Sequence, residues 1–65
     1  MKFNHKLLRQ LRARNALTLN EMSRLSGFPL CNLSLWERGK RHPLAKNLRR
    51  LAKLYGVPME SFFTE

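Results

Sequence analysis

The sequence contains no aspartate and few acidic residues of any kind. Four glutamates, at positions 21, 37, 60 and 65, stand against thirteen lysines and arginines, and the formal net charge is +9. Soluble surfaces usually mix both signs and carry a net charge of about 2 to 8, so this surplus of cations indicates a polyanionic partner. No two glutamates are close in the sequence, which argues against a catalytic carboxylate pair.

Cysteines and long apolar runs are also scarce. The single cysteine, Cys31, cannot form an internal disulfide, which excludes a disulfide scaffold. No stretch approaches the roughly 20 apolar residues that span a bilayer. The first residues, 1–6, are not followed by the apolar run and cleavage site of a secretory signal. We therefore expect a cytoplasmic protein with no membrane partner.

Groups that could bind a metal or catalyse a reaction are few. His5, Cys31 and His42 lack the paired spacing of a zinc site. The sequence has no glycine-rich phosphate loop, and no serine or cysteine nucleophile has a base at a recognisable spacing. We expect no enzyme activity, no cofactor, no bound metal and no small-molecule ligand.

Glycines and prolines divide the chain into helices. Sixty-five residues make one domain, residues 1–65, with a small core. Glycine is favoured just after a helix and proline at the start of the next one. Each glycine is followed within four residues by a proline, in the pairs Gly27 and Pro29, Gly39 and Pro43, and Gly56 and Pro58. These pairs predict three junctions between helices.

A fourth junction lies at residues 15–18. Asn15 tolerates a left-handed cap, and Thr18 with Glu21 has the spacing of a capping box. Leu17 and Met22 occupy the two positions of a hydrophobic staple.

The apolar periodicity predicts an all-α fold with no competing strand pattern. In the fourth helix, the apolar stripe lies opposite a basic face of Lys46, Arg49, Arg50 and Lys53. Five helices are expected, over residues 3–14, 19–26, 30–38, 44–55 and 59–63.

The second and third helices have the spacing of a helix-turn-helix unit. A short turn at residues 26–29 sets two short helices at a steep angle. At about 100° per residue, Leu33 and Trp36 fall on the core side of the third helix. An outward face is then made of Cys31, Asn32, Ser34 and Leu35, and Leu30 projects at the amino-terminal tip.

From Leu8 to Phe63 the sequence resembles the Xre/Cro family of phage repressors, Cro proteins and small bacterial regulators. The matching residues are the "LRQLR" of 8–12, "LT" of 17–18, Glu21, Gly27, "ERGKR" of 37–41 with Pro43, and "LAKLYGVPMESFF" of 51–63. The resemblance implies a compact five-helix bundle of the lambda-repressor-like DNA-binding type. Its third helix would enter the major groove, usually as a homodimer on a palindromic double-stranded DNA operator.

The resemblance and the helix geometry together name candidate site residues. In the family, an arginine in the first helix pairs with a glutamate at the end of the third helix. Arg12 and Glu37 match these positions, so the resemblance implies a structural salt bridge between them. Single cations such as Arg9, Arg14 and Lys53 are interpreted as solvated charges. Base contacts are predicted at Leu30, Cys31, Asn32, Ser34 and Leu35, and phosphate contacts at Thr18, Asn20, Arg38, Lys40, Arg41 and Lys46.

The outward face of the third helix departs from the family pattern, which is mostly polar there. Leu30, Cys31 and Leu35 are apolar, and Leu19 stands where a glutamine is frequent. Apolar side chains read thymine methyl groups, and Asn32 is suited to adenine, so one hypothesis is a half-site rich in A·T pairs.

The alternative is that Leu30, Cys31 and Leu35 form a protein-docking patch on an antirepressor- or antitoxin-like adaptor. The cations of residues 38–41 favour DNA, and the capped, punctuated helices argue against a membrane-active peptide. A sequence-specific, repressor-like transcriptional regulator is therefore predicted. Because one helix reads few base pairs, a homodimer is expected, with Met59 and Phe63 as candidates for its interface.

Overall fold

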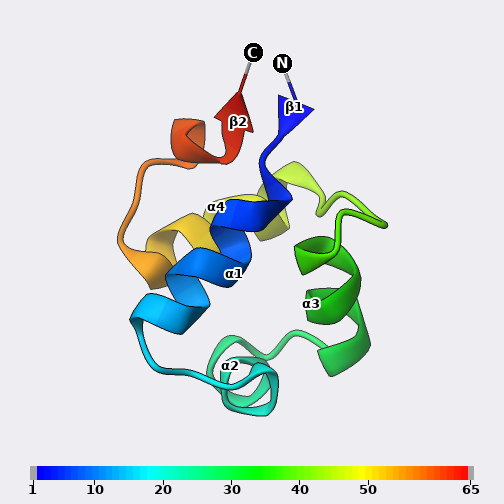
Figure 1. Ribbon diagram of the computed structural model, residues 1–65, viewed down its shortest axis with the longest axis vertical. Coiled ribbons are helices and arrows are strands. Elements are labelled where there is room, and N and C mark those ends of the chain that lie inside the picture. Colours follow the sequence, from blue (N-terminus) through cyan, green and yellow to red (C-terminus); the bar gives the residue numbers. More distant parts are fainter. Residues whose placement is uncertain (1, 65) are drawn as a thin grey trace.

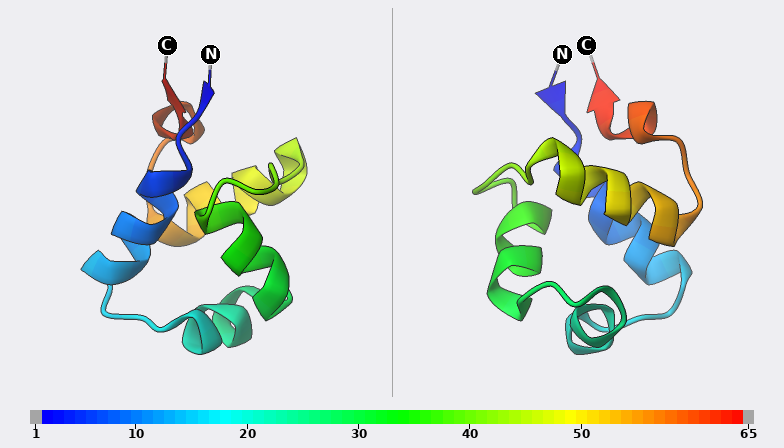
Figure 2. Two further views of the ribbon diagram at one scale, coloured as in Figure 1. Left: turned by 45° about the vertical axis from the view of Figure 1, so that its right-hand side comes forward. Right: turned by 180° about the vertical axis from the view of Figure 1, so that it is seen from behind.

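The computed structural model describes residues 2–64, which form four α-helices, one 3₁₀-helix and one two-stranded sheet (Figure 1). The elements in chain order are β1 (Lys2–Phe3), α1 (His5–Arg14), α2 (Leu19–Ser26), α3 (Leu30–Glu37), α4 (Ala45–Tyr55), η1 (Met59–Phe62) and β2 (Phe63–Thr64). Helix α3 packs against both α1 and α2. Helix α4 crosses behind α1 in Figure 1 and lies in front of it in the view from behind in Figure 2. No helix in the described part of the chain is long and apolar enough to cross a membrane.

The predicted fifth helix, residues 59–63, and the predicted start of the first helix at residue 3 are wrong. The chain pairs its two ends as antiparallel strands instead, with Lys2 opposite Thr64 and Phe3 opposite Phe63. The segment between Pro58 and β2 therefore holds only the four residues of η1, and so few residues suit a 3₁₀ turn. This pairing is not encoded locally, because its partners lie at opposite ends of the sequence.

The helix ends largely follow the predicted signals. Gly27, Gly39 and Gly56 all have positive φ angles, of 79°, 74° and 70°. The capping box at the start of α2 is present in both directions. One detail was wrong: the left-handed residue between α1 and α2 is Ala16, with φ of 55°, and not Asn15. Asn15 instead donates its side-chain amide to the carbonyl of Leu11.

The core is formed where α1, α3, α4 and η1 meet. Leu33 and Trp36 of α3 are buried, as predicted from the helical period. The ring of Trp36 meets that of Phe28, in the helix-turn-helix turn, edge to face at 5.2 Å. The remaining buried apolar residues are Phe3, Leu8, Leu11, Met22, Leu48, Leu51, Ala52 and Phe62. The core therefore holds the face of α3 that carries Leu33 and Trp36, and this fixes which face points outward.

Arg50 lies on the exposed basic face of α4, as the periodicity predicted, and it also contacts the turn before α3. Its Nη2 atom donates to the carbonyl of Ser26 at 2.6 Å, and its guanidinium lies 4.5 Å from the centre of the Phe28 ring. Arg50 thus supplies a hydrogen bond at the carboxyl end of α2 and holds the turn before α3 against α4.

Candidate nucleic-acid interface

The predicted base-reading residues lie along α3 but differ in exposure. Leu30 and Cys31 are exposed, whereas Asn32, Ser34 and Leu35 are half-buried. Leu35 lies on the outward side of α3, as predicted, but its side chain is half-buried in a surface depression. The amide of Lys40 donates to its carbonyl at 2.9 Å, so the backbone of Leu35 also anchors the loop that follows α3.

A shallow, mainly apolar depression of about 410 Å³ joins α3 to the first turn of α2. Leu19 of α2 contributes to it, a residue that the sequence singled out only as a departure from the family pattern. Its lining residues are Leu19, Leu30, Cys31, Ser34, Leu35 and Arg38. The apolar residues of α3 are therefore gathered with Leu19 in one surface patch.

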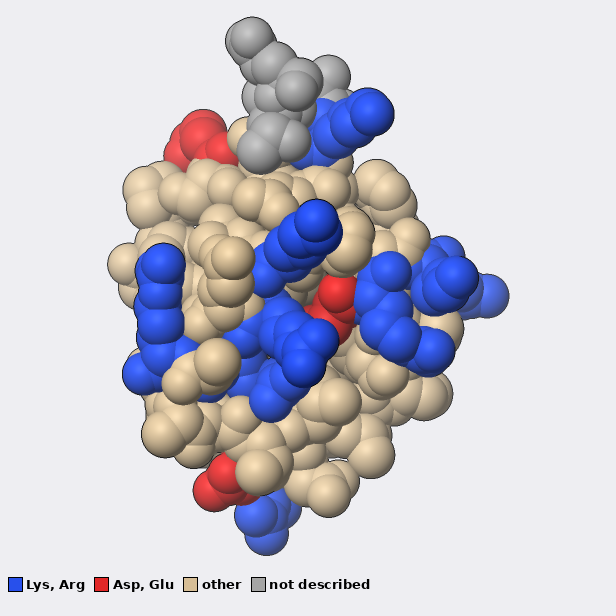
Figure 3. All heavy atoms as spheres, in the orientation of Figure 1, with Lys and Arg blue, Asp and Glu red and all other residues tan. Residues whose placement is uncertain are grey.

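Cations flank this patch (Figure 3). Lys and Arg side chains gather over α1 and over the end of α3 with the loop beyond it. Arg38, Lys40 and Arg41 are exposed at the end of α3, and Lys46 is exposed in the first turn of α4. Helix α3 itself carries no cation. The positive charge therefore lies beside the predicted reading face, the side of α3 that carries the predicted base contacts, and not on it.

The start of α2 offers backbone amides to an anion. The capping box already uses two of them, because the amide of Thr18 donates to Glu21 and the amide of Glu21 donates to Thr18 Oγ1. These bonds hold the pKa of Glu21 below its usual value. The amides of Leu19 and Asn20, in the same turn, take no part in the capping box.

Arg12 and Glu37 form a bidentate ion pair that ties α1 to the end of α3. Arg12 Nε lies 2.7 Å from Glu37 Oε2, and Nη2 lies 2.9 Å from Oε1. The third donor, Nη1, bonds the carbonyl of Leu17 at 2.9 Å. The hydrogen bonds to Glu37 raise the pKa of Arg12. Tyr55 lies near enough for the Glu37 charge to act on it, and burial first and that charge second raise its pKa to about 12.

His5 was missed as a structural residue by the sequence reasoning. Its Nδ1 donates to the backbone carbonyl of Glu37 at 2.9 Å, which satisfies an orphan carbonyl at the end of α3. The ring also packs against Gly39. No sequence signal could have found this contact, because the bonded residues are 32 positions apart. Among the described residues, His5 belongs to no group of three that could hold a metal.

The two candidates for a dimer interface are tied to the core. Met59 and Phe63 are half-buried against it, and Phe63 meets Phe3 edge to face at 6.5 Å. More apolar surface is exposed elsewhere, at Leu25, Leu44 and Leu54.

A short turn between α2 and α3, with α3 exposed and flanked by cations, defines the helix-turn-helix class of DNA-binding domain. The family described as helix-turn-helix matches residues 8–62. The chain therefore belongs to the Xre/Cro-like helix-turn-helix family, a family of DNA-binding regulators. The comparisons with curated proteins and with solved structures found no match.

Proposed function

We propose that this protein is a sequence-specific, repressor-like transcriptional regulator that binds a palindromic DNA operator as a homodimer. Helix α3 enters the major groove, which is about 12 Å wide and admits one helix. Lys40 and Arg41 contact phosphates beside it. The observation that carries the proposal is the position of the cations, because they border the exposed face of α3 without covering it.

Selection of bound sequences from a random DNA pool tests this function. We expect a two-fold symmetric consensus with half-sites about 34 Å apart, one turn of DNA. A strictly monomeric protein, with and without this DNA, would contradict the homodimer. Enrichment of no sequence at all would contradict specific recognition.

Two variants separate the roles of α3 and the loop. Leu35→Glu places a carboxylate against the groove, and we expect it to lose the selected operator. Arg41→Ala should weaken all duplexes alike and flatten the dependence of log affinity on log salt by about 1. Lys53→Ala is the control, because it also removes one exposed cation but from α4. Gel shifts measure all three, and unchanged binding by both Leu35→Glu and Arg41→Ala would reject the DNA function.

The apolar reading face supports recognition of thymine methyl groups. Leu30, Cys31 and Leu35 offer no strong hydrogen bond to a base edge, and apolar contact with the thymine methyl is the readout left to them. Replacing thymine by uracil in the half-sites should weaken binding about 4-fold for each buried methyl, or about 0.8 kcal/mol. The same replacement outside the half-sites is the control. Equal affinity for both operators would contradict methyl readout.

The apolar depression between α2 and α3 also supports a second candidate, an antirepressor- or antitoxin-like adaptor that docks a protein. If the protein were such an adaptor, selection from the random pool would enrich no DNA sequence. Arg41→Ala would then leave the weak, nonspecific affinity of the protein for DNA unchanged. The cations on both sides of the depression favour DNA.

A further inference from the structure

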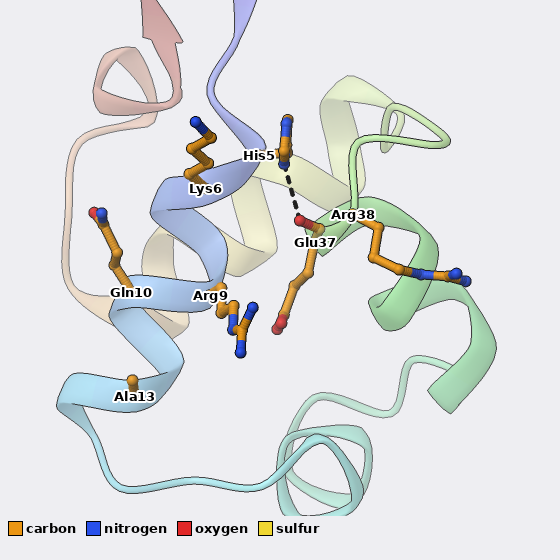
Figure 4. A pocket seen from close by; sticks show the side chains of 7 residues that line it. All are labelled: His5, Lys6, Arg9, Gln10, Ala13, Glu37 and Arg38. Carbon is orange, nitrogen blue, oxygen red and sulfur yellow. Dashed lines mark hydrogen bonds between the residues drawn. The ribbon is translucent and has the colours of Figure 1, made fainter.

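A second hollow lies outside the reading face, between α1 and the end of α3. Its volume is about 560 Å³. Figure 4 shows Arg9 projecting from α1 into it toward Glu37, Lys6 on its rim, and Arg38 leading away along α3. His5 and Gln10 also line it. The hollow is therefore open to solvent and bordered by three cations.

No carboxylate in the described chain pairs with these cations, although Arg38 Nε donates to the carbonyl of Ser34 at 3.4 Å. Among residues 2–64, Lys6, Arg9 and Arg38 form no ion pair. Glu37 is the one carboxylate among the described lining residues, and both its oxygens already accept bonds from Arg12. The positive charge around the hollow is thus not neutralised within the described chain.

The same cations do not stabilise α1. Lys6 lies in the first turn of the helix, where the macrodipole disfavours positive charge. Arg9 lies three residues further along the same helix, where like charges repel. The helix His5–Arg14 contains no acidic residue that would offset either effect. Their position is better explained by an external anion than by folding.

The hollow is continuous with the reading face. A smaller hollow of about 240 Å³ shares Arg9, Glu37 and Arg38 with it, and is bounded on the other side by Leu19 and Ser34. Those last two residues, with Arg38, also line the depression on α3. A connected track therefore runs from α1, past Arg38, to the start of α2 and the reading face.

We propose that the hollow on α1 binds a phosphate of the DNA backbone through Lys6 and Arg9, beside the site that α3 reads. The proposal rests on the proposed function and extends the protein's footprint along one strand. It reassigns Arg9, which the sequence alone left as a solvated charge. The ligand is a phosphodiester because the track leads to Leu19, in the first turn of α2, where a helix offers backbone amides to a phosphate.

Salt titration of DNA binding tests this site. The variant Lys6→Ala/Arg9→Ala is compared with Arg14→Ala/Lys53→Ala, whose cations lie outside the hollow; each lowers the net charge of +9 by two. Losing one phosphate contact flattens the dependence of log affinity on log salt by about 0.9 for each bound protomer. We expect that flattening in the first variant alone, with equal weakening on the selected operator and on unrelated duplex.

Equal salt slopes for the two variants would overturn the proposal, because the effect would then come from net charge. A loss confined to the selected operator would also overturn it, since phosphates carry no sequence information. If the unaltered protein bound no duplex, the proposed function would fail as well, and that result is distinguishable from an unchanged slope. All four side chains are exposed, so both variants should remain folded at the temperature of the binding assay.

Discussion

Arg12→Ala is expected to lower the free energy of unfolding by about 3 to 5 kcal/mol. The Arg12 side chain is 16% exposed and that of Glu37 is 7% exposed, so the variant leaves a carboxylate buried without its bidentate partner. It also removes the donor to the carbonyl of Leu17. A chain of 65 residues has roughly 3 to 10 kcal/mol in total, so much of the stability is lost. Urea unfolding followed by the fluorescence of Trp36 measures it.

Two further variants distinguish the loss of stability caused by an unpaired buried charge from the loss caused by removing any arginine of α1. Arg14→Ala removes an exposed arginine from the same helix, and we expect a change within about 0.5 kcal/mol. Replacing both partners, as Arg12→Met with Glu37→Leu, should be less costly than Arg12→Ala, because no buried charge remains. If Arg12→Ala unfolded at the same urea concentration as the parent, the ion pair would not hold α1 to α3.

Gly39→Ala is expected to destabilise the protein by roughly 2 to 4 kcal/mol, from left-handed strain and overpacking together. Gly39 has φ of 74°, and an added Cβ would lie 2.6 Å from Cδ2 of His5. The ring cannot move away freely, because its Nδ1 is bonded to the carbonyl of Glu37. The substitution therefore strains the loop and breaks the cap on α3 at once.

Gly56→Ala provides the matched control. Its φ of 70° is similar, but nothing lies within 4 Å of its added Cβ, so it should show only the left-handed strain of about 1 to 2 kcal/mol. Adding His5→Ala to Gly39→Ala should recover part of the loss, because the clash is removed. Thermal unfolding measures the set, and equal losses at Gly39 and Gly56 would show that the ring does not restrict Gly39.

The Gly39 contact also bears on DNA binding. His5 and Gly39 hold the end of α3 and the start of the loop that carries Lys40 and Arg41. The amides of both cations donate to the carbonyl of Leu35, so two hydrogen bonds anchor the loop to one carbonyl of α3. A distorted loop should therefore weaken phosphate contacts before it alters base preference.

Most helix ends were predictable because their signals are local. The capping box of Thr18 and Glu21 spans three residues, and it places the start of α2 correctly. Gly27 and Gly56 end their helices with positive φ angles, as their positions indicated. The buried faces followed from the helical period, which holds Leu33 and Trp36 on one side of α3.

Apart from the left-handed residue at Ala16, what the sequence analysis missed was a contact between distant residues. The pairing of Phe3 with Phe63 replaced the expected ends of the first and fifth helices. Arg50 is exposed as its helix period predicted, but that period could not show its contact with Phe28 in the turn before α3. Leu35 was placed on the outward face of the third helix, but its contact with Leu19 of another helix in one depression was not foreseen.

The sequence by itself determined the helix-turn-helix unit, the basic character of the protein and the apolar nature of its reading face. Each depends on residue type or on spacing within one helix, and no other part of the chain is needed to recognise them. Only the tertiary structure decided that His5 caps α3 and that Lys6 and Arg9 border a hollow continuous with the reading face. The reason is physical: packing brings α1 against the end of α3, and no local pattern encodes which distant side chains then meet.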